Sequence, residues 1–192
     1  MREPKDTGEF EIVRVNSGKK IQRYKAYEQG EILPLVCATL PLIGTDEIAE
    51  LLRSGKKRLL GNEWVFFMSE HKKAEDRTTL ETLTRGLKEE LNYTMENGFF
   101  DLDEEIILKY RDRACQKALR WKVHSYVVPI NSLSDLTPDG KEIIEIRSRP
   151  IDEVMHDLYK KKSIYKKFSP ELFFKTIDMR TRQVIADNKI NY

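Results

Sequence analysis

Hydrophobic residues follow two different spacings along this chain of 192 residues, and each spacing predicts a different kind of element. Residues 9–15 and 118–130 alternate between apolar and polar positions, which is typical of a strand with one buried face. Further segments rich in apolar residues predict strands at 57–60, 63–68, 104–114 and 143–148. The long apolar run 32–44 predicts one or two core strands, and Pro34 and Pro41 confine a strand to an edge or interrupt it.

Apolar residues three and four positions apart predict helices. The clearest helix is capped by Asp76 and runs to about Leu91, with Asn92 as its stop. Its buried stripe consists of four leucines, Leu80, Leu83, Leu87 and Leu91. A shorter helix is predicted at 45–55, between an N-terminal threonine cap and a C-terminal glycine.

The remaining segments complete a mixed order of strands and helices. The C-terminal part is predicted to be helical at 151–162 and 169–186, whereas residues 69–75 form a polar turn. Residues 19–30 fit a helix and a strand equally well. No linker divides the chain, so the order predicts one layered α/β (α+β) domain.

Composition indicates a globular protein with a charged surface. Hydrophobic residues make up 40% of the chain and charged residues 34%, with a formal net charge of +2. No apolar run is long enough to span a membrane and the N-terminus lacks a signal-peptide core, so we expect a cytoplasmic protein. Cys37 and Cys115 are expected to be buried free thiols, and three scattered histidines propose no zinc site.

Basic and aromatic residues leave room for an anionic ligand. Five clusters of lysine and arginine occur, at 19–20, 56–58, 72–73, 160–162 and 166–167. A basic cluster is most often a solvated face, but clusters from different segments can converge on one surface. Tyr24, Tyr27 and Tyr165 are candidate stacking surfaces for RNA, although half-buried packing is the commoner role of such tyrosines.

Residues 64–93 carry the most specific pattern, WVFFMSEHKKAEDRTTLETLTRGLKEELNY. Its end, RGLKEELNY, resembles the second half of the Nudix box, G-x5-E-x7-R-E-U-x-E-E-x-G-U, where U is a bulky apolar residue. Arg85 matches the arginine, Leu87 the apolar position, and Glu89 and Glu90 the paired glutamates.

The resemblance implies a Nudix-like α/β/α sandwich, in which the box helix and C-terminal helices pack on a mixed sheet. It covers roughly residues 32–180, because the strands and helix that follow the box resemble the family as well. We therefore predict a Nudix-like domain at 32–192 and an N-terminal extension at 1–31 that packs on it.

Several box positions depart from the family pattern. His71 occupies the position of the first glycine, and Glu70 before it stands where the family commonly has another glycine. Arg77 replaces the first glutamate and Asn92 the last glycine. Gly86 replaces the glutamate that follows the arginine, and a glycine inside a helix suggests that a neighbour needs the space.

The resemblance implies a site for Mg²⁺ or Mn²⁺, since the family's helical glutamates hold divalent metal beside a diphosphate. Here Glu89 and Glu90 are the implied catalytic and metal residues, with Arg85 orienting a carboxylate. The resemblance implies that the site has lost a ligand, because Gly86 stands at the position of the third glutamate. The two glutamates that remain are adjacent, and adjacent helical residues diverge by about 100°. Glu142 is the preferred replacement, and the other candidates are Asp139, Glu145, Glu70 and Glu75.

Three functions remain open from the sequence. The first is a Nudix-fold protein that binds a nucleotide, another phosphorylated small molecule or a protein partner, with little or no hydrolysis. The second is a divergent hydrolase that cleaves a nucleoside diphosphate linked to another group. The third is an RNA-binding module. A homodimer is compatible with each of them.

Overall fold

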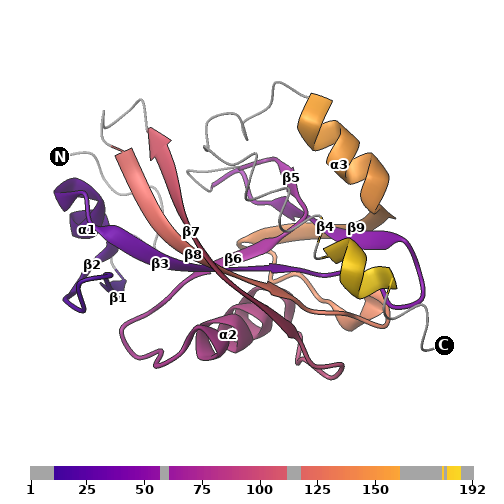
Figure 1. Ribbon diagram of the computed structural model, residues 1–192, viewed down its shortest axis with the longest axis horizontal. Coiled ribbons are helices and arrows are strands. Elements are labelled where there is room, and N and C mark those ends of the chain that lie inside the picture. Colours follow the sequence, from indigo (N-terminus) through magenta and orange to yellow (C-terminus); the bar gives the residue numbers. More distant parts are fainter. Residues whose placement is uncertain (1–10, 57–60, 112–117, 161–178, 180, 187–192) are drawn as a thin grey trace.

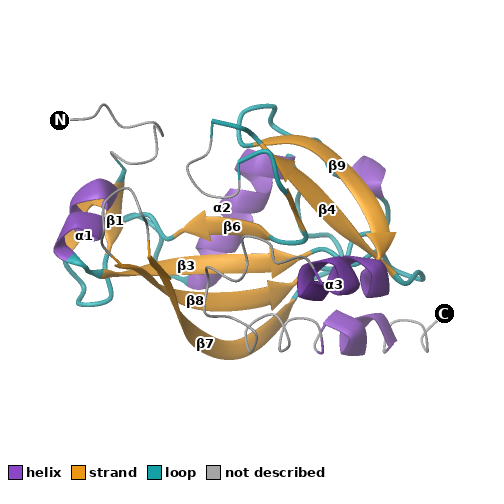
Figure 2. Ribbon diagram, turned by 90° about the horizontal axis from the view of Figure 1, so that it is seen from above, coloured by secondary structure: helices purple, strands orange, loops and turns teal. Residues whose placement is uncertain are grey.

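The computed structural model describes residues 11–56, 61–111, 118–160, 179 and 181–186. Within them, the chain forms both strands and helices, as Figures 1 and 2 show. The elements are β1 (Ile12–Arg14), β2 (Lys20–Gln22), α1 (Arg23–Gln29), β3 (Ile32–Thr39), β4 (Glu47–Arg53), β5 (Trp64–Val65), β6 (Met68–His71), α2 (Thr79–Leu91), β7 (Phe100–Arg111), β8 (Ala118–Val127), a 3-10 turn (Leu133–Asp135), β9 (Ile143–Pro150) and α3 (Ile151–Lys160).

A mixed four-stranded sheet in the order β6-β3-β8-β7 forms the centre of the described fold. β3 runs parallel to β8, whereas β6 and β7 are antiparallel to their neighbours. The predicted core strand in the run 32–44 is confirmed as β3, an interior strand, and Pro34 lies within it and neither interrupts it nor makes it an edge. Pro34 is tolerated because β6 pairs with β3 only from Leu35 onward, and no backbone donor is needed at residue 34 on that side.

A second sheet, in the order β5-β4-β9, contradicts one helix prediction. Residues 45–55 were expected to form a short helix, but Glu47–Arg53 form β4, antiparallel to both β5 and β9. The local spacing of Ile48 and Leu51 fits a helix, yet both side chains are buried by strand neighbours that are distant in sequence. Tertiary pairing therefore overrides the local pattern.

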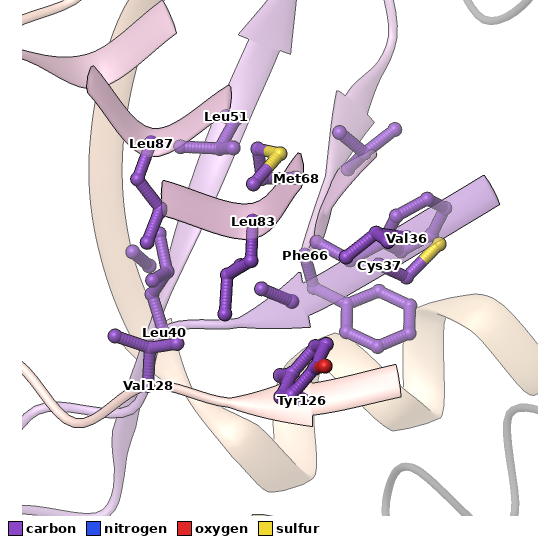
Figure 3. Close-up of a cluster of buried hydrophobic side chains, with 14 of the residues drawn as sticks. Val36, Cys37, Leu40, Leu51, Phe66, Met68, Leu83, Leu87, Tyr126 and Val128 are labelled. Carbon is purple, nitrogen blue, oxygen red and sulfur yellow. The ribbon is translucent and has the colours of Figure 1, made fainter. Parts of the chain in front are cut away.

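Helix α2 packs on the four-stranded sheet through the predicted leucine stripe. Leu83, Leu87 and Leu91 are fully buried, and Figure 3 shows the first two beside Leu40 and Tyr126 of the core. The helix ends at Asn92, which adopts the left-handed conformation with φ 47°, as predicted. It begins later than expected, because its cap is Thr78 rather than Asp76.

The predicted turn at 69–75 is partly wrong, because β6 continues through His71. Residues 19–30, which fit a helix and a strand equally well, form both β2 and α1. Val13, Val15, Ile21 and Ala26 from this N-terminal part are buried in the same hydrophobic core as the sheet residues.

The C-terminal elements lie on the other side of the strands from α2, as Figure 1 shows for α3. Residues 179 and 181–186 are helical, and the hydroxyl oxygens of Thr181 and Thr39 are 3.0 Å apart. The predicted strand 57–60 and most of the predicted helix 169–186 lie outside the described residues. No helix in the described part of the chain is long and apolar enough to cross a membrane.

Candidate functional site

The two glutamates of the box lie on different faces of α2. Glu90 shares the buried face with Leu83, Gly86 and Leu87, and it is only 5% exposed. The Glu89 side chain is 49% exposed and points away from this face toward Lys73. The predicted divergence of neighbouring helical residues is therefore confirmed, and the two carboxylates lie in different surroundings.

Arg85 is the centre of a hydrogen-bond network at the entrance to the helix. Its Nη2 donates to the His71 carbonyl and to Asp76 Oδ2, both at 2.8 Å, and its Nε donates to Asp76 Oδ1 at 3.2 Å. Nη1 lies 3.1 Å from Glu89 Oε2 and 3.2 Å from Glu70 Oε1. Burial acts to lower the pKa of Arg85, but these acidic partners outweigh it and raise the pKa.

Asp76 has a structural role here that differs from the predicted helix cap. Its Oδ2 accepts hydrogen bonds from the Lys73 backbone N–H at 2.9 Å and the Thr82 hydroxyl at 3.0 Å, in addition to Arg85. Burial acts to raise the pKa of Asp76, but these hydrogen bonds and the Arg85 charge hold it below its usual value. Asp76 therefore fixes the loop before α2 and orients Arg85.

Glu70 fills the space that Gly86 leaves open. A Cβ on residue 86 would lie 3.0 Å from Glu70 Cβ, 3.1 Å from Glu70 Cγ and 3.2 Å from Met68 Cε. β6 carries Glu70 across the buried face of α2, where its side chain is 13% exposed and paired with Arg85. The sequence signal was the reciprocal departure of residues 70 and 86 from the box, but only the structure shows that the two positions touch.

The carboxylate of Glu90 lies near two other carboxylates, those of Glu70 and Glu142. Burial and then the charges of Glu70 and Glu142 raise its pKa well above the usual value, while Arg53 acts in the opposite direction. The carboxylates of Glu70 and Glu90 lie within hydrogen-bonding reach of each other. Among the described residues, Glu90 Oε1 has no hydrogen-bond partner, although it is buried.

Glu142, the preferred replacement carboxylate, is held near this cluster by the turn before β9. Asp139 Oδ1 accepts hydrogen bonds from the backbone N–H groups of Lys141, Glu142 and Ile143, at 2.9–3.0 Å. The Asp139 N–H donates to the Glu90 carbonyl at 3.0 Å, which ties the turn to the end of α2. Asp139 thus shapes the turn, and the charge of Glu142 reaches both Glu70 and Glu90.

The donor set fits a hard divalent cation only in part. Within the described ranges, no three His, Cys, Asp or Glu side chains are grouped closely enough to enclose a metal ion. However, Mg²⁺ is commonly held by one or two carboxylates together with water and ligand phosphates. The unpartnered Glu90 oxygen and the neighbouring Glu70 carboxylate fit that arrangement. The other two candidates, Glu75 and Glu145, are exposed.

The described basic and aromatic candidates for RNA binding near this site are engaged in contacts within the protein. Lys72 Nζ donates to the Arg77 carbonyl at 2.8 Å, and Lys73 Nζ pairs with Glu89 at 3.4 Å. Tyr27 packs edge-on against His71 and Trp121. The clusters 160–162 and 166–167 and Tyr165 lie largely or wholly outside the described residues.

Comparison with known proteins identifies the fold. No protein-family model and no curated protein matches the sequence. Among solved structures, the NUDIX domain of Shewanella oneidensis NrtR, complexed with ADP-ribose, has a TM-score of 0.52 at 15% identity, covering 65% of this chain and 77% of that one. The MutT protein of Methanosarcina mazei Go1 has a TM-score of 0.53 at 17% identity, covering 79% and 94%. A Deinococcus radiodurans protein has a TM-score of 0.56 at 13% identity, covering 80% and 90%. With the box helix in place on a mixed sheet, this chain has a Nudix-like fold.

Proposed function

We propose that this protein binds a nucleoside-diphosphate-type ligand at the face formed by α2 and β6, and hydrolyses it little or not at all. The observation that carries the proposal is the state of Glu89, which is paired with Arg85 and Lys73 instead of facing Glu90. Gly86 supplies no carboxylate three residues before it. The ADP-ribose complex of the NrtR domain supports this class of ligand.

The cofactor implied by the fold is Mg²⁺ or Mn²⁺. When bound, such an ion would neutralise phosphate oxygens and lower the pKa of an attacking water. Glu90 would hold it with its unpartnered oxygen, beside Glu70. Arg85 orients Glu70 through its 3.2 Å ion pair and fixes the loop through Asp76.

A Mg²⁺-dependent Nudix-type hydrolase is the second candidate. It is favoured by the survival of Arg85 and Glu90 and by the presence of Glu142, which would act as the general base. Turnover requires that Glu89 exchange its pairing with Lys73 for the metal, or that other carboxylates suffice. The two candidates therefore differ in rate rather than in the class of ligand.

The test combines ligand-induced stabilisation with a turnover assay. ADP-ribose and ADP should raise the unfolding temperature of the full chain, whereas AMP, which lacks the diphosphate, serves as the matched control. A ligand at 100 times its Kd stabilises by about 2.7 kcal/mol. Absence of stabilisation by every diphosphate, with and without Mg²⁺ or Mn²⁺, would overturn the proposal.

Turnover of the same ligands separates the two candidates. Hydrolysis that disappears in both Glu89→Gln and Glu90→Gln would establish the hydrolase instead of the binding protein. Hydrolysis that survives both substitutions would exclude a mechanism through the box glutamates. Stabilisation without hydrolysis is the result that we expect.

A further inference from the structure

Residues 70 and 86 show a reciprocal departure from the box that has a geometric explanation. The box has a glutamate where this chain has Gly86, and the family commonly has a glycine where this chain has Glu70. In the structure the two positions are in contact, since a Cβ on residue 86 would come within 3.0–3.1 Å of the Glu70 side chain. Side chains at both positions would therefore crowd each other, and a glycine at one of them avoids the shift of a few tenths of an ångström that this contact would require.

We infer that the cation-binding carboxylate has moved from the helix to the strand, so that a divalent cation binds between Glu70 of β6 and Glu90 of α2. The inference rests on the proposed function in placing a ligand at this face. It goes further because it assigns a strand residue, Glu70, as a ligand of the cation and excludes Glu89 as a ligand.

Three observations on the buried face of α2 support this assignment. Glu90 is 5% exposed and its Oε1 has no hydrogen-bond partner among the described residues. A buried acceptor without a partner is unusual, and a bound cation would satisfy it. The carboxylate of Glu70 lies within hydrogen-bonding reach of the Glu90 carboxylate. Arg85 holds Glu70 in that position through an ion pair of 3.2 Å.

Glu89 is less suited to hold the cation. Its side chain is 49% exposed, and its Oε2 is paired with Arg85 at 3.1 Å and with Lys73 at 3.4 Å. Both ion pairs would have to break before this carboxylate could turn toward Glu90. The ion pair of Glu70 with Arg85 can stay in place, because it already holds the Glu70 carboxylate near Glu90. A cation between Glu70 and Glu90 would relieve the repulsion of their two carboxylates.

Mn²⁺ alone tests the assignment, because the binding of Mn²⁺ removes its free-ion signal from the electron paramagnetic resonance spectrum. We expect the full chain to bind Mn²⁺ without any nucleotide, and Glu70→Gln and Glu90→Gln each to weaken binding about tenfold or more. Glu89→Gln is the variant that discriminates between the two arrangements, and it should leave the Mn²⁺ affinity unchanged if Glu70 has taken the place of the helical ligand. Glu81→Gln, on the exposed face of the same helix, is the matched control. Thermal unfolding of each variant confirms that it is folded.

An exchange of residues provides a second test. Glu70→Gly should lose Mn²⁺ affinity, and the double variant Glu70→Gly/Gly86→Glu should regain it, because the carboxylate returns to the helix where the strand no longer blocks it. If the double variant is folded and does not regain affinity, positions 70 and 86 are not interchangeable and the inference is wrong.

The assignment would also be overturned by wild-type protein that does not bind Mn²⁺, or by a loss in Glu89→Gln as large as that in Glu70→Gln. These results can be told apart from a failure of the proposed function, because stabilisation by ADP-ribose is measured without metal as well as with it. Stabilisation by ADP-ribose without Mn²⁺ binding would refute the cation site alone. Mn²⁺ binding through Glu70 and Glu90, with no response to any diphosphate, would refute the proposed ligand alone.

Discussion

Two buried glutamates in this protein have equal exposure and opposite surroundings. Glu50 and Glu90 are each 5% exposed. Glu50 on β4 lies 2.7 Å from Arg147 Nη2 and 3.5 Å from Arg149 Nη1 on β9, so two cations compensate its charge. Glu90 on α2 instead faces the carboxylates of Glu70 and Glu142. The β4–β9 sheet uses a buried charge for structure, whereas on the α2 face the repulsion of two carboxylates outweighs the opposing charge of Arg53, a balance that is common in binding sites.

Arg85 compensates the negative charges of Asp76 and Glu70 on the α2 face but not that of Glu90. Replacing it should therefore have the largest effect. We expect Arg85→Met to lower the free energy of unfolding by about 3–5 kcal/mol, since it strands two buried carboxylates. Chemical denaturation measures the loss.

Lys88→Met on the exposed face of α2 is the control for this substitution. It removes a cation of similar length from the same helix and should change stability by no more than about 0.5 kcal/mol. Equal losses in the two variants would mean that the network around Arg85 does not stabilise the fold.

The Glu50 side of the comparison predicts the next largest effect. Glu50→Gln keeps the volume and one acceptor but removes the charge that holds Arg147 and Arg149. We expect a loss of about 1.5–3 kcal/mol, which is the range for hydrogen bonds to charged groups. Glu153→Gln, which also faces Arg149 but is exposed, should cost much less. A neutral effect of Glu50→Gln would remove the contrast with Glu90.

Local patterns predicted α2 well, but they could not predict its neighbours. The leucine stripe and the Asn92 stop follow from residues within one helix, so periodicity was enough. β4 was mistaken for a helix, because its partners β5 and β9 come later in the chain and supply the pairing. Glu142 was predicted as the replacement carboxylate, and its charge reaches Glu70 and Glu90, but its role stays a prediction. The contact between Glu70 and Gly86 depends on how β6 packs against α2.

Glu90→Gln should raise the stability of the protein, whereas Glu50→Gln should lower it. Glu90→Gln is the same chemical change as Glu50→Gln at the same exposure, but it removes a charge that its neighbours repel. We expect a gain of about 0.5–2 kcal/mol, measured as a higher unfolding midpoint in denaturant without added metal. Added Mn²⁺ should reduce the difference in unfolding midpoint between the variant and the wild type, since it stabilises the wild type and not the variant. A loss of stability in Glu90→Gln without metal would show that Glu90 is compensated after all.

The smallest effect concerns Gly86, and it tests whether Glu70 is the reason for a glycine in the helix. Alanine in place of glycine inside a helix is worth about 1 kcal/mol, so Gly86→Ala should stabilise α2 where space allows. In the wild type the new Cβ meets Glu70 at 3.0–3.1 Å, and we expect the gain to vanish. In the Glu70→Gly background both contacts with Glu70 are gone and only Met68 Cε, at 3.2 Å, remains close, so most of the gain should return, and the difference is the coupling energy of the two positions. Thr84→Ala on the exposed face of α2 should give the same change in both backgrounds. An equal gain for Gly86→Ala with and without Glu70 would mean that the glycine is unrelated to the strand carboxylate.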